Sequence, residues 1–238
     1  MDSKLDINFD FNSDTPPNRD PDSHSPTLRR YHKILWSKPL PNGKIFELRD
    51  DKDGVYLYHI SELGEFFLGS DAITHSYKNH KRKHWITKQI PNEVNELYSK
   101  GSTIGAYTVF PNNRIDGNQT INQARGINRF IDDRFDLTLE CIRLFYLGQQ
   151  SPLHDTLFKY KKFFDLFDNF IGYIKFFLLE DLIDENGKVK FYLPFDDFNT
   201  GPKFSNTDEY LMYYNKVINF IKLRNKMIEN YIYLNRNK

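Results

Sequence analysis

The side chains best suited to chemistry gather between residues 70 and 85, in the stretch SDAITHSYKNHKRKHW. Basic side chains neutralise phosphate groups, and an aromatic ring can stack on a base. The pattern therefore predicts contact with a nucleic acid or a nucleotide phosphate. The alternative is a charged segment exposed to water. The residues expected to bind phosphate or nucleic acid here are Lys78, Lys81, Arg82, Lys83 and Trp85.

Two histidines are candidates for acid–base catalysis, because an imidazole changes its charge near neutral pH. His75 lies inside the basic stretch, and His59 follows the apolar run YLY. The alternative for His59 is a hydrogen-bonded residue of the core. A metal site is disfavoured, because His75, His80 and His84 come without a cysteine pair or an HExxH motif. We expect no metal ion and no cofactor.

Residues 121–143, INQARGINRFIDDRFDLTLECIR, form a second polar cluster whose apolar residues recur at helical spacing. We predict one helix over residues 120–147. At about 100° per residue, most of its charged side chains fall on one stripe. Such a stripe is typical of a solvated helix face. If it lines a cleft instead, Arg125 and Arg129 are its electropositive end and candidate phosphate ligands.

Arg134 is the exception, since the same helical phase places it on the apolar face near Thr138 and Cys141. A buried guanidinium without a partner is costly, so it must meet a carboxylate, several carbonyls or a bound anion. Two interpretations follow. Arg134 is either a structural ion pair or a clamp for an anion, because its planar fork suits two-point contacts with oxyanions.

Composition and motifs exclude several classes of protein. The chain has 33 Lys and Arg against 32 Asp and Glu, so any nucleic-acid site must be local. One cysteine forms no intramolecular disulfide. The sequence lacks the signatures of serine hydrolases, P-loop and dinucleotide-binding proteins and kinases. RNKMIEN is similar to the RNxxxH of HEPN ribonucleases, but Glu229 replaces the histidine, which rejects that assignment.

The sequence predicts an α+β fold after a flexible leader over residues 1–30, which is rich in Pro, Asp and Ser. Residues 31–233 are expected to form a single domain, with 21 Phe and 15 Tyr supplying much of its core. We expect an antiparallel sheet of about five strands from residues 31–70, 103–110 and 188–193, packed by Phe-rich helices over 120–147, 152–183 and 207–233.

The start of the chain has no basic region followed by an apolar run, so we expect no signal peptide. The most apolar stretch, NFIGYIKFFLLEDLI, is interrupted by Lys175, Glu180 and Asp181 and is too short to span a bilayer. We therefore expect a cytoplasmic protein without a membrane partner.

The segments IGAYTVFP, TINQARG, DRFDLTLECIR, SPL and FFLLEDL occur in an order and spacing that resemble a bacterial protein family of unassigned function. The resemblance covers about residues 30–232. It implies one intact domain from an intracellular bacterial or phage setting, and it supplies no activity and no site residue.

Two hypotheses for function stay open. The first is a protein that binds RNA or a nucleotide phosphate, with a metal-independent ribonuclease or nucleotide-modifying enzyme of a defence or toxin type as its enzymatic form. The second is a non-enzymatic protein-interaction or regulatory module. The sequence indicates neither a reaction nor an oligomeric state.

Overall fold

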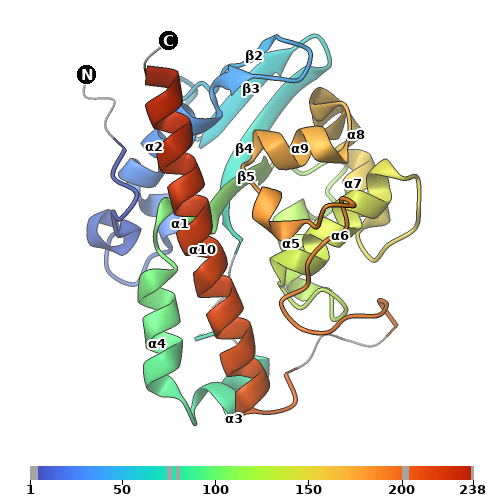
Figure 1. Ribbon diagram of the computed structural model, residues 1–238. Helices are drawn as coiled ribbons and strands as arrows, with labels where there is room; N and C mark the ends of the chain where they lie inside the picture. Colours follow the sequence, from blue (N-terminus) through green and yellow to red (C-terminus); the bar gives the residue numbers. More distant parts are fainter. Residues whose placement is uncertain (1–4, 74–76, 79–80, 200–203, 237–238) are drawn as a thin grey trace.

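A computed structural model describes residues 5–73, 77–78, 81–199 and 204–236, with only the backbone of Arg82, Asn235 and Arg236 (Figure 1). The fold mixes helices with two small antiparallel sheets, which confirms the α+β class. The helices are α1 (Pro21–His24), α2 (Pro26–Trp36), α3 (His84–Thr87), α4 (Pro91–Lys100), α5 (Ile121–Ile127), α6 (Phe135–Tyr146), α7 (His154–Lys159), α8 (Lys161–Phe164), α9 (Phe170–Phe176) and α10 (Thr207–Arg236). Short 3-10 turns are η1 (Phe11–Asp14), η2 (Lys81–Lys83), η3 (Ile104–Ala106), η4 (Asp165–Phe167) and η5 (Glu180–Leu182).

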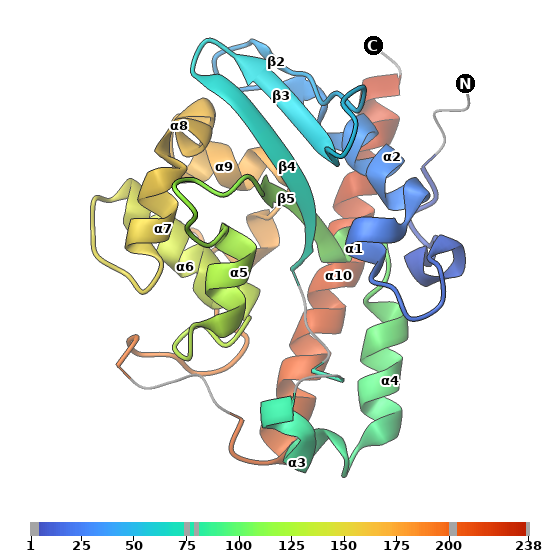
Figure 2. The ribbon, with the colours of Figure 1, turned by 180° about the vertical axis from the view of Figure 1, so that it is seen from behind.

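The main sheet has three antiparallel strands in the order β3 (Leu57–Ser61), β4 (Gly64–Ala72) and β5 (Tyr107–Pro111). A separate hairpin pairs β1 (Lys38–Pro39) with β2 (Ile45–Phe46). Helices α5 to α9 group on the side of β4 and β5 away from α10, and α4 lies beside α10 (Figures 1 and 2).

Two of the predicted strand regions are wrong. Residues 188–193 form no strand, and Val189 makes only an isolated bridge with Ile183. Residues 31–36 belong to α2 instead. The hydroxyl of Ser25 caps this helix by accepting a hydrogen bond from the Leu28 amide, and Pro26 fits its first turn. The helical spacing also buries Leu28, Tyr31, His32, Leu35 and Trp36 on one face.

The segment before residue 30 is packed, in contrast to the flexible leader that we expected. It contains η1, α1 and the first turn of α2. The ring of Phe11 is fully buried and meets Tyr31 and Tyr107 edge to face, with ring centroids 5.5 and 5.6 Å away. Such aromatic pairs stabilise a core beyond the area that they bury. The N-terminal segment is therefore part of the hydrophobic core.

The single helix predicted over residues 120–147 is broken into α5 and α6. Asp132 and Asp133 between them have φ angles of +49° and +63°, in the left-handed region that interrupts a right-handed helix. The break changes the helical phase, and Ile127, at the end of α5, is 62% exposed. Arg134 becomes the residue that precedes α6.

Helix α10 is anchored to the sheet side of the fold by two consecutive polar residues. The buried guanidinium of Arg224 donates to the main-chain carbonyls of Gly105, Tyr107, Phe177 and Leu178. Asn225 Oδ1 accepts a 2.7 Å hydrogen bond from the Gly105 amide. A Cβ at position 105 would lie 2.6 Å from that Oδ1, so the contact requires glycine.

Within the described ranges, no helix combines the length and apolarity needed to cross a bilayer.

Candidate functional site

The structure uses three of the predicted phosphate-binding cations in buried contacts within the protein. Arg134 pairs with the fully buried Asp136 through Nε and Nη2 of its guanidinium, which corresponds to the structural ion pair rather than the anion clamp. The buried Lys83 Nζ lies 2.5 Å from Asp132 Oδ2. Arg125, which is 1% exposed, is the third.

Arg125 fixes the junction between β4 and the loop before α6. Its Nη1 is 2.9 Å from Asp71 Oδ2, its Nη2 donates to the Asp133 carbonyl, and its Nε donates to the Thr138 hydroxyl. The two polar clusters of the sequence therefore meet in space. They meet through occupied ion pairs rather than through cations that face a cleft.

His59 also lies in the core. Its ring is 3% exposed and lies between Phe46 and Phe66, with centroids 4.3 and 6.4 Å away. Its Nδ1 is 3.0 Å from the Glu47 carbonyl, and burial lowers its pKa. Such an environment suits the structural alternative. His75, the other candidate catalytic residue, falls outside the described residues.

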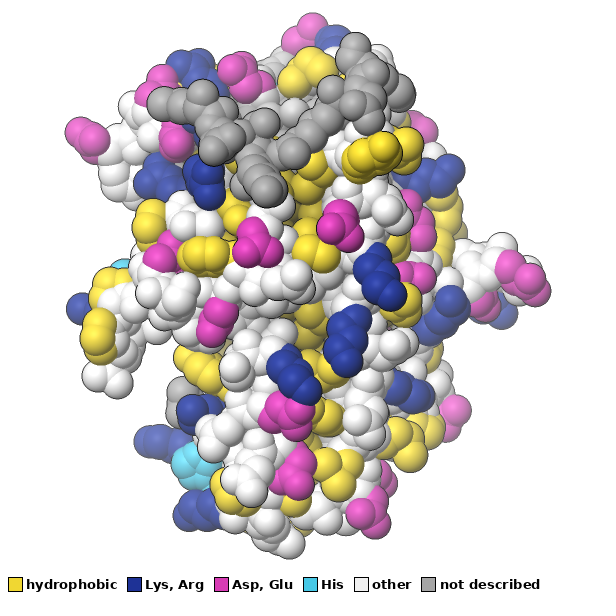
Figure 3. Space-filling model, turned by 60° about the vertical axis from the view of Figure 1, so that its left-hand side comes forward, with side chains coloured by type: hydrophobic (Ala, Val, Ile, Leu, Met, Phe, Trp, Pro, Cys, Tyr) yellow, Lys and Arg dark blue, Asp and Glu magenta, His cyan; other side chains and the backbone are white. Residues whose placement is uncertain are grey.

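The remaining predicted ligands are at the surface. Lys78, Lys81 and Arg129 are exposed, Trp85 is 54% exposed, and the Arg82 side chain is outside the described part of the chain. Lys78 Nζ lies 4.6 Å from the centre of the Tyr98 ring. On the face that Figure 3 shows, basic side chains are interspersed with acidic ones. The described surface there is mixed rather than broadly basic.

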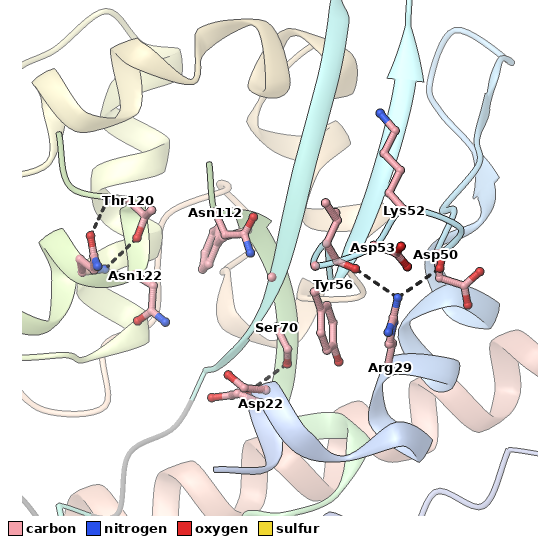
Figure 4. Close-up of a pocket in the computed structure, with 16 residues that line it drawn as sticks. Asp22, Arg29, Asp50, Lys52, Asp53, Tyr56, Ser70, Asn112, Thr120 and Asn122 are labelled. Atoms are coloured by element: carbon pink, nitrogen blue, oxygen red, sulfur yellow. Dashed lines mark hydrogen bonds between the residues drawn. The ribbon is translucent and has the colours of Figure 1, made fainter. Parts of the chain in front are cut away.

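A different part of the molecule contains two neighbouring cavities. The first cavity, of about 610 Å³, lies between α1, the start of α2, β4 and the start of α5 (Figure 4). The second cavity, of about 1070 Å³, lies between the N-terminal segment, the end of β4 and the end of α4. Asp22 and Asn122 line both cavities, so the two meet at these side chains.

Asp22 ends a chain of hydrogen bonds that starts in the core. Trp36 Nε1 donates to His32 Nδ1 over 3.0 Å, and His32 Nε2 is 2.9 Å from the Ser70 hydroxyl. The Ser70 hydroxyl donates to Asp22 Oδ1 over 3.0 Å (Figure 4). An indole N–H is only a donor, so Nδ1 of His32 must accept and Nε2 must carry the proton. The network therefore assigns one direction to every bond.

This direction excludes a serine nucleophile activated by histidine. His32 Nε2 donates to Ser70 and has no lone pair with which to remove the hydroxyl proton. Burial, followed by the charge of Arg224, lowers the pKa of His32 to about 3. The hydrogen bonds from His32 through Ser70 therefore position Asp22 and do not activate Ser70. Burial, followed by the charges of Asp20 and Asp71, raises the pKa of Asp22 well above its usual range, so this group favours the protonated acid.

His32 is expected to stay neutral, with its proton on Nε2, from pH 8 down to about pH 4. Nitrogen NMR of the imidazole measures both the charge and the tautomer. Because its pKa is lower in the folded than in the unfolded chain, His32 removes stability as the pH falls below about 6.5 toward 3. A resonance that titrates near pH 6.5 would contradict the hydrogen-bond chain.

The second cavity has an acidic lining. Asp71 lines it, and burial raises the pKa of Asp71 to about 7 despite the neighbouring Arg125. Hydrogen-bond donors or cations are favoured next to such walls, and phosphate is disfavoured. Arg19 and Lys78 are the basic residues among its described lining, against Asp10, Asp20, Asp22, Asp71 and Asp133. The described residues hold no group of three metal-ligating side chains.

The sequence alone does not mark Asp22, His32 or Ser70 as site residues. The i,i+4 spacing of His32 and Trp36 is the one sequence signal for this chain, and it is visible only once α2 is recognised as a helix. Ser70 and Asp71 begin the basic stretch, but only its cations and its aromatic ring indicate a ligand.

A family model described as "Family of unknown function (DUF6994)" matches residues 5–228. No curated protein and no solved structure matches the chain. The family match covers most of the sequence and agrees with the resemblance to a family of unassigned function. The chain therefore belongs to the family of unknown function DUF6994.

Proposed function

We propose that this protein binds a small polar ligand where the two cavities meet, and that the Asp22 carboxyl group contacts it. The observation that carries the proposal is the hydrogen-bond chain from Trp36 through His32 and Ser70 to Asp22. Side chains locked by such a second layer are typical of binding and catalytic sites. These hydrogen bonds hold the Asp22 side chain in the wall that the two cavities share.

The lining of the second cavity indicates what the ligand presents. Carboxylates accept hydrogen bonds, so the ligand should offer donors, either hydroxyl or ammonium groups. Sugars, nucleosides and polyamines share this property. Asn122, which lines both cavities, has an amide that can donate to or accept from the same ligand.

A thermal-shift screen with sugars, nucleosides and polyamines tests the proposal, followed by calorimetric titration of the hits. Asp22→Asn is expected to weaken a hit about 10-fold, roughly the cost of one lost hydrogen bond, because the amide nitrogen cannot accept from the ligand. The control is Asp155→Asn, an exposed aspartate of α7 that lines neither cavity. The proposal fails if no compound binds, or if both variants bind as the wild type does. Binding of polyols would indicate that the site prefers hydroxyl donors, and binding of amines that it prefers ammonium donors.

We propose RNA binding as a second function, because the Lys81 side chain and the Trp85 ring are exposed within one short segment. Such residues can contact phosphate and stack on a base. A short single-stranded RNA is expected to bind at low salt, with the affinity falling as salt rises. Trp85→Ala should weaken binding about 5- to 160-fold, which corresponds to roughly 1–3 kcal/mol of stacking energy. Absence of binding by the folded protein at low salt ends this second proposal.

A further inference from the structure

The first cavity contains two buried donors that the protein itself does not use. Within the described chain, Arg29 Nε and the Tyr56 hydroxyl are buried without a hydrogen-bond partner. Both side chains line the first cavity, and the Arg29 guanidinium lies over the Tyr56 ring, 5.6 Å from its centre (Figure 4). Buried donors are nearly always satisfied, so two neighbouring orphans in one cavity indicate a missing acceptor.

The charge of Arg29 points to an anionic acceptor. Its Nη2 donates to the main-chain carbonyls of Asp50 and Val55, and no carboxylate of the described residues pairs with it. Two charged neighbours in the cavity wall are engaged elsewhere, and Asp22 and Asp53, which also line it, form no ion pair with Arg29 among the described residues. Asp50 pairs with Lys33, and Lys52 pairs with Glu65. The guanidinium is thus held in place by carbonyls while its charge stays without a counter-ion.

The rest of the wall supports a polar occupant. Asn112 packs against the Cα of Gly69, where an added Cβ would lie 2.8 Å from its amide nitrogen, so β4 and the residue after β5 meet closely at this point. The Asn112 and Asn122 amides both line the cavity, and the Tyr56 hydroxyl lies near Ser70. Arg29 and Tyr56 therefore face the same space as the end of the hydrogen-bond chain.

We infer that Arg29 and Tyr56 form an oxyanion subsite, in which a carboxylate or phosphate group of the ligand accepts hydrogen bonds from Arg29 Nε and the Tyr56 hydroxyl. The inference rests on the proposed function, because it takes the two cavities as parts of one site. The ligand then carries hydroxyl or ammonium donors at one end and an anionic group at the other. Nucleotides, sugar acids and amino-acid derivatives have this chemistry.

Inorganic phosphate and acetate serve as probes, each titrated into the full-length protein while the Arg29 Nε–H resonance is followed by NMR. We expect a saturable shift with at least one of them, and their relative affinities distinguish a phosphate from a carboxylate subsite. Arg29→Met should weaken binding of the better probe at least 10-fold, and Tyr56→Phe about 3- to 10-fold. Arg30→Met is the matched control, since Arg30 is the exposed neighbour and lines neither cavity.

The inference is overturned if neither anion produces a saturable shift, or if Arg29→Met and Arg30→Met bind equally well. Arg29 also ties the segment after residue 49 to α2, so its variant is checked by circular dichroism. If Arg29→Met does not fold, Tyr56→Phe decides, because it removes one hydroxyl and keeps the ring. The donor-ligand screen with Asp22→Asn is separate. Binding of donor ligands without binding of anions rejects the subsite alone, and anion binding without donor ligands rejects the proposed function instead.

Discussion

Replacing Arg134 with methionine is expected to lower the free energy of unfolding by about 3–5 kcal/mol, the usual cost of removing one partner of a buried pair. Arg134 is 1% exposed, and its partner Asp136 is fully buried. Asp136 Oδ2 also accepts a 2.8 Å hydrogen bond from the Tyr192 amide. Without Arg134, this one donor cannot offset the cost of burying the Asp136 charge. Urea unfolding of the variant and the wild type measures the difference.

Two further variants make the result specific. Arg129→Met removes an exposed arginine of the same segment and should change the stability by no more than about 0.5 kcal/mol. Asp136→Asn in the Arg134→Met background should recover part of the loss, because the amide no longer buries an unpaired charge. Equal, negligible effects of Arg134→Met and Arg129→Met would contradict the buried ion pair.

Arg224→Met is expected to cost about 4 kcal/mol or more, or to prevent folding. The side chain donates to four main-chain carbonyls, and it has no carboxylate partner within the described residues. A buried carbonyl left without a donor costs roughly 1–3 kcal/mol. Burial lowers the pKa of Arg224 to about 10, which still leaves it charged at pH 7.

Lys226→Met, an exposed change on the same helix, is the control and should stay within about 0.5 kcal/mol of the wild type. Hydrogen exchange at Gly105 and Tyr107 reports the same contact locally, since loss of Arg224 should release α10 from this segment. A loss below about 1 kcal/mol would show that the four carbonyls do not depend on Arg224.

Arg134 shows how far the sequence leads. Its burial was predicted from the phase of one continuous helix, and it is buried and paired, but the helix is broken by Asp132 and Asp133. Arg125 Nη2 donates to the carbonyl of Asp133, and Lys83, from outside the segment, pairs with Asp132. Such a tertiary contact has no periodic signal in the sequence.

The α+β class followed from local patterns, whereas the candidate site did not. Asp22 and Ser70 are 48 residues apart, and His32 and Ser70 are 38 apart, so only packing of α1 and α2 against β4 brings them together. The segment that supplies Asp22 looked disordered because it is rich in proline and aspartate. Phe11 buries completely, and Leu5, Ile7 and Phe9 pack against the core while partly buried.

The predicted phosphate ligands of the basic stretch also depend on tertiary contacts that the sequence does not show. Composition alone does not distinguish an exposed lysine from one in a buried pair, and Lys83 is buried beside Asp132, with the Phe204 ring centre 4.9 Å from its Nζ. The neighbouring Lys81 is exposed. Long basic side chains bury their stems readily when a carboxylate meets the amine.

A crystallographic screen of small polar fragments, which includes sugars, amines and carboxylic acids, tests the central claim most directly. We expect bound fragments to concentrate where the two cavities meet, with a donor group on the Asp22 carboxyl. Fragments with an acid group should also reach Arg29. The claim is contradicted if crystals with open cavities show no fragment at Asp22 while fragments bind elsewhere, for example beside Lys81 and Trp85.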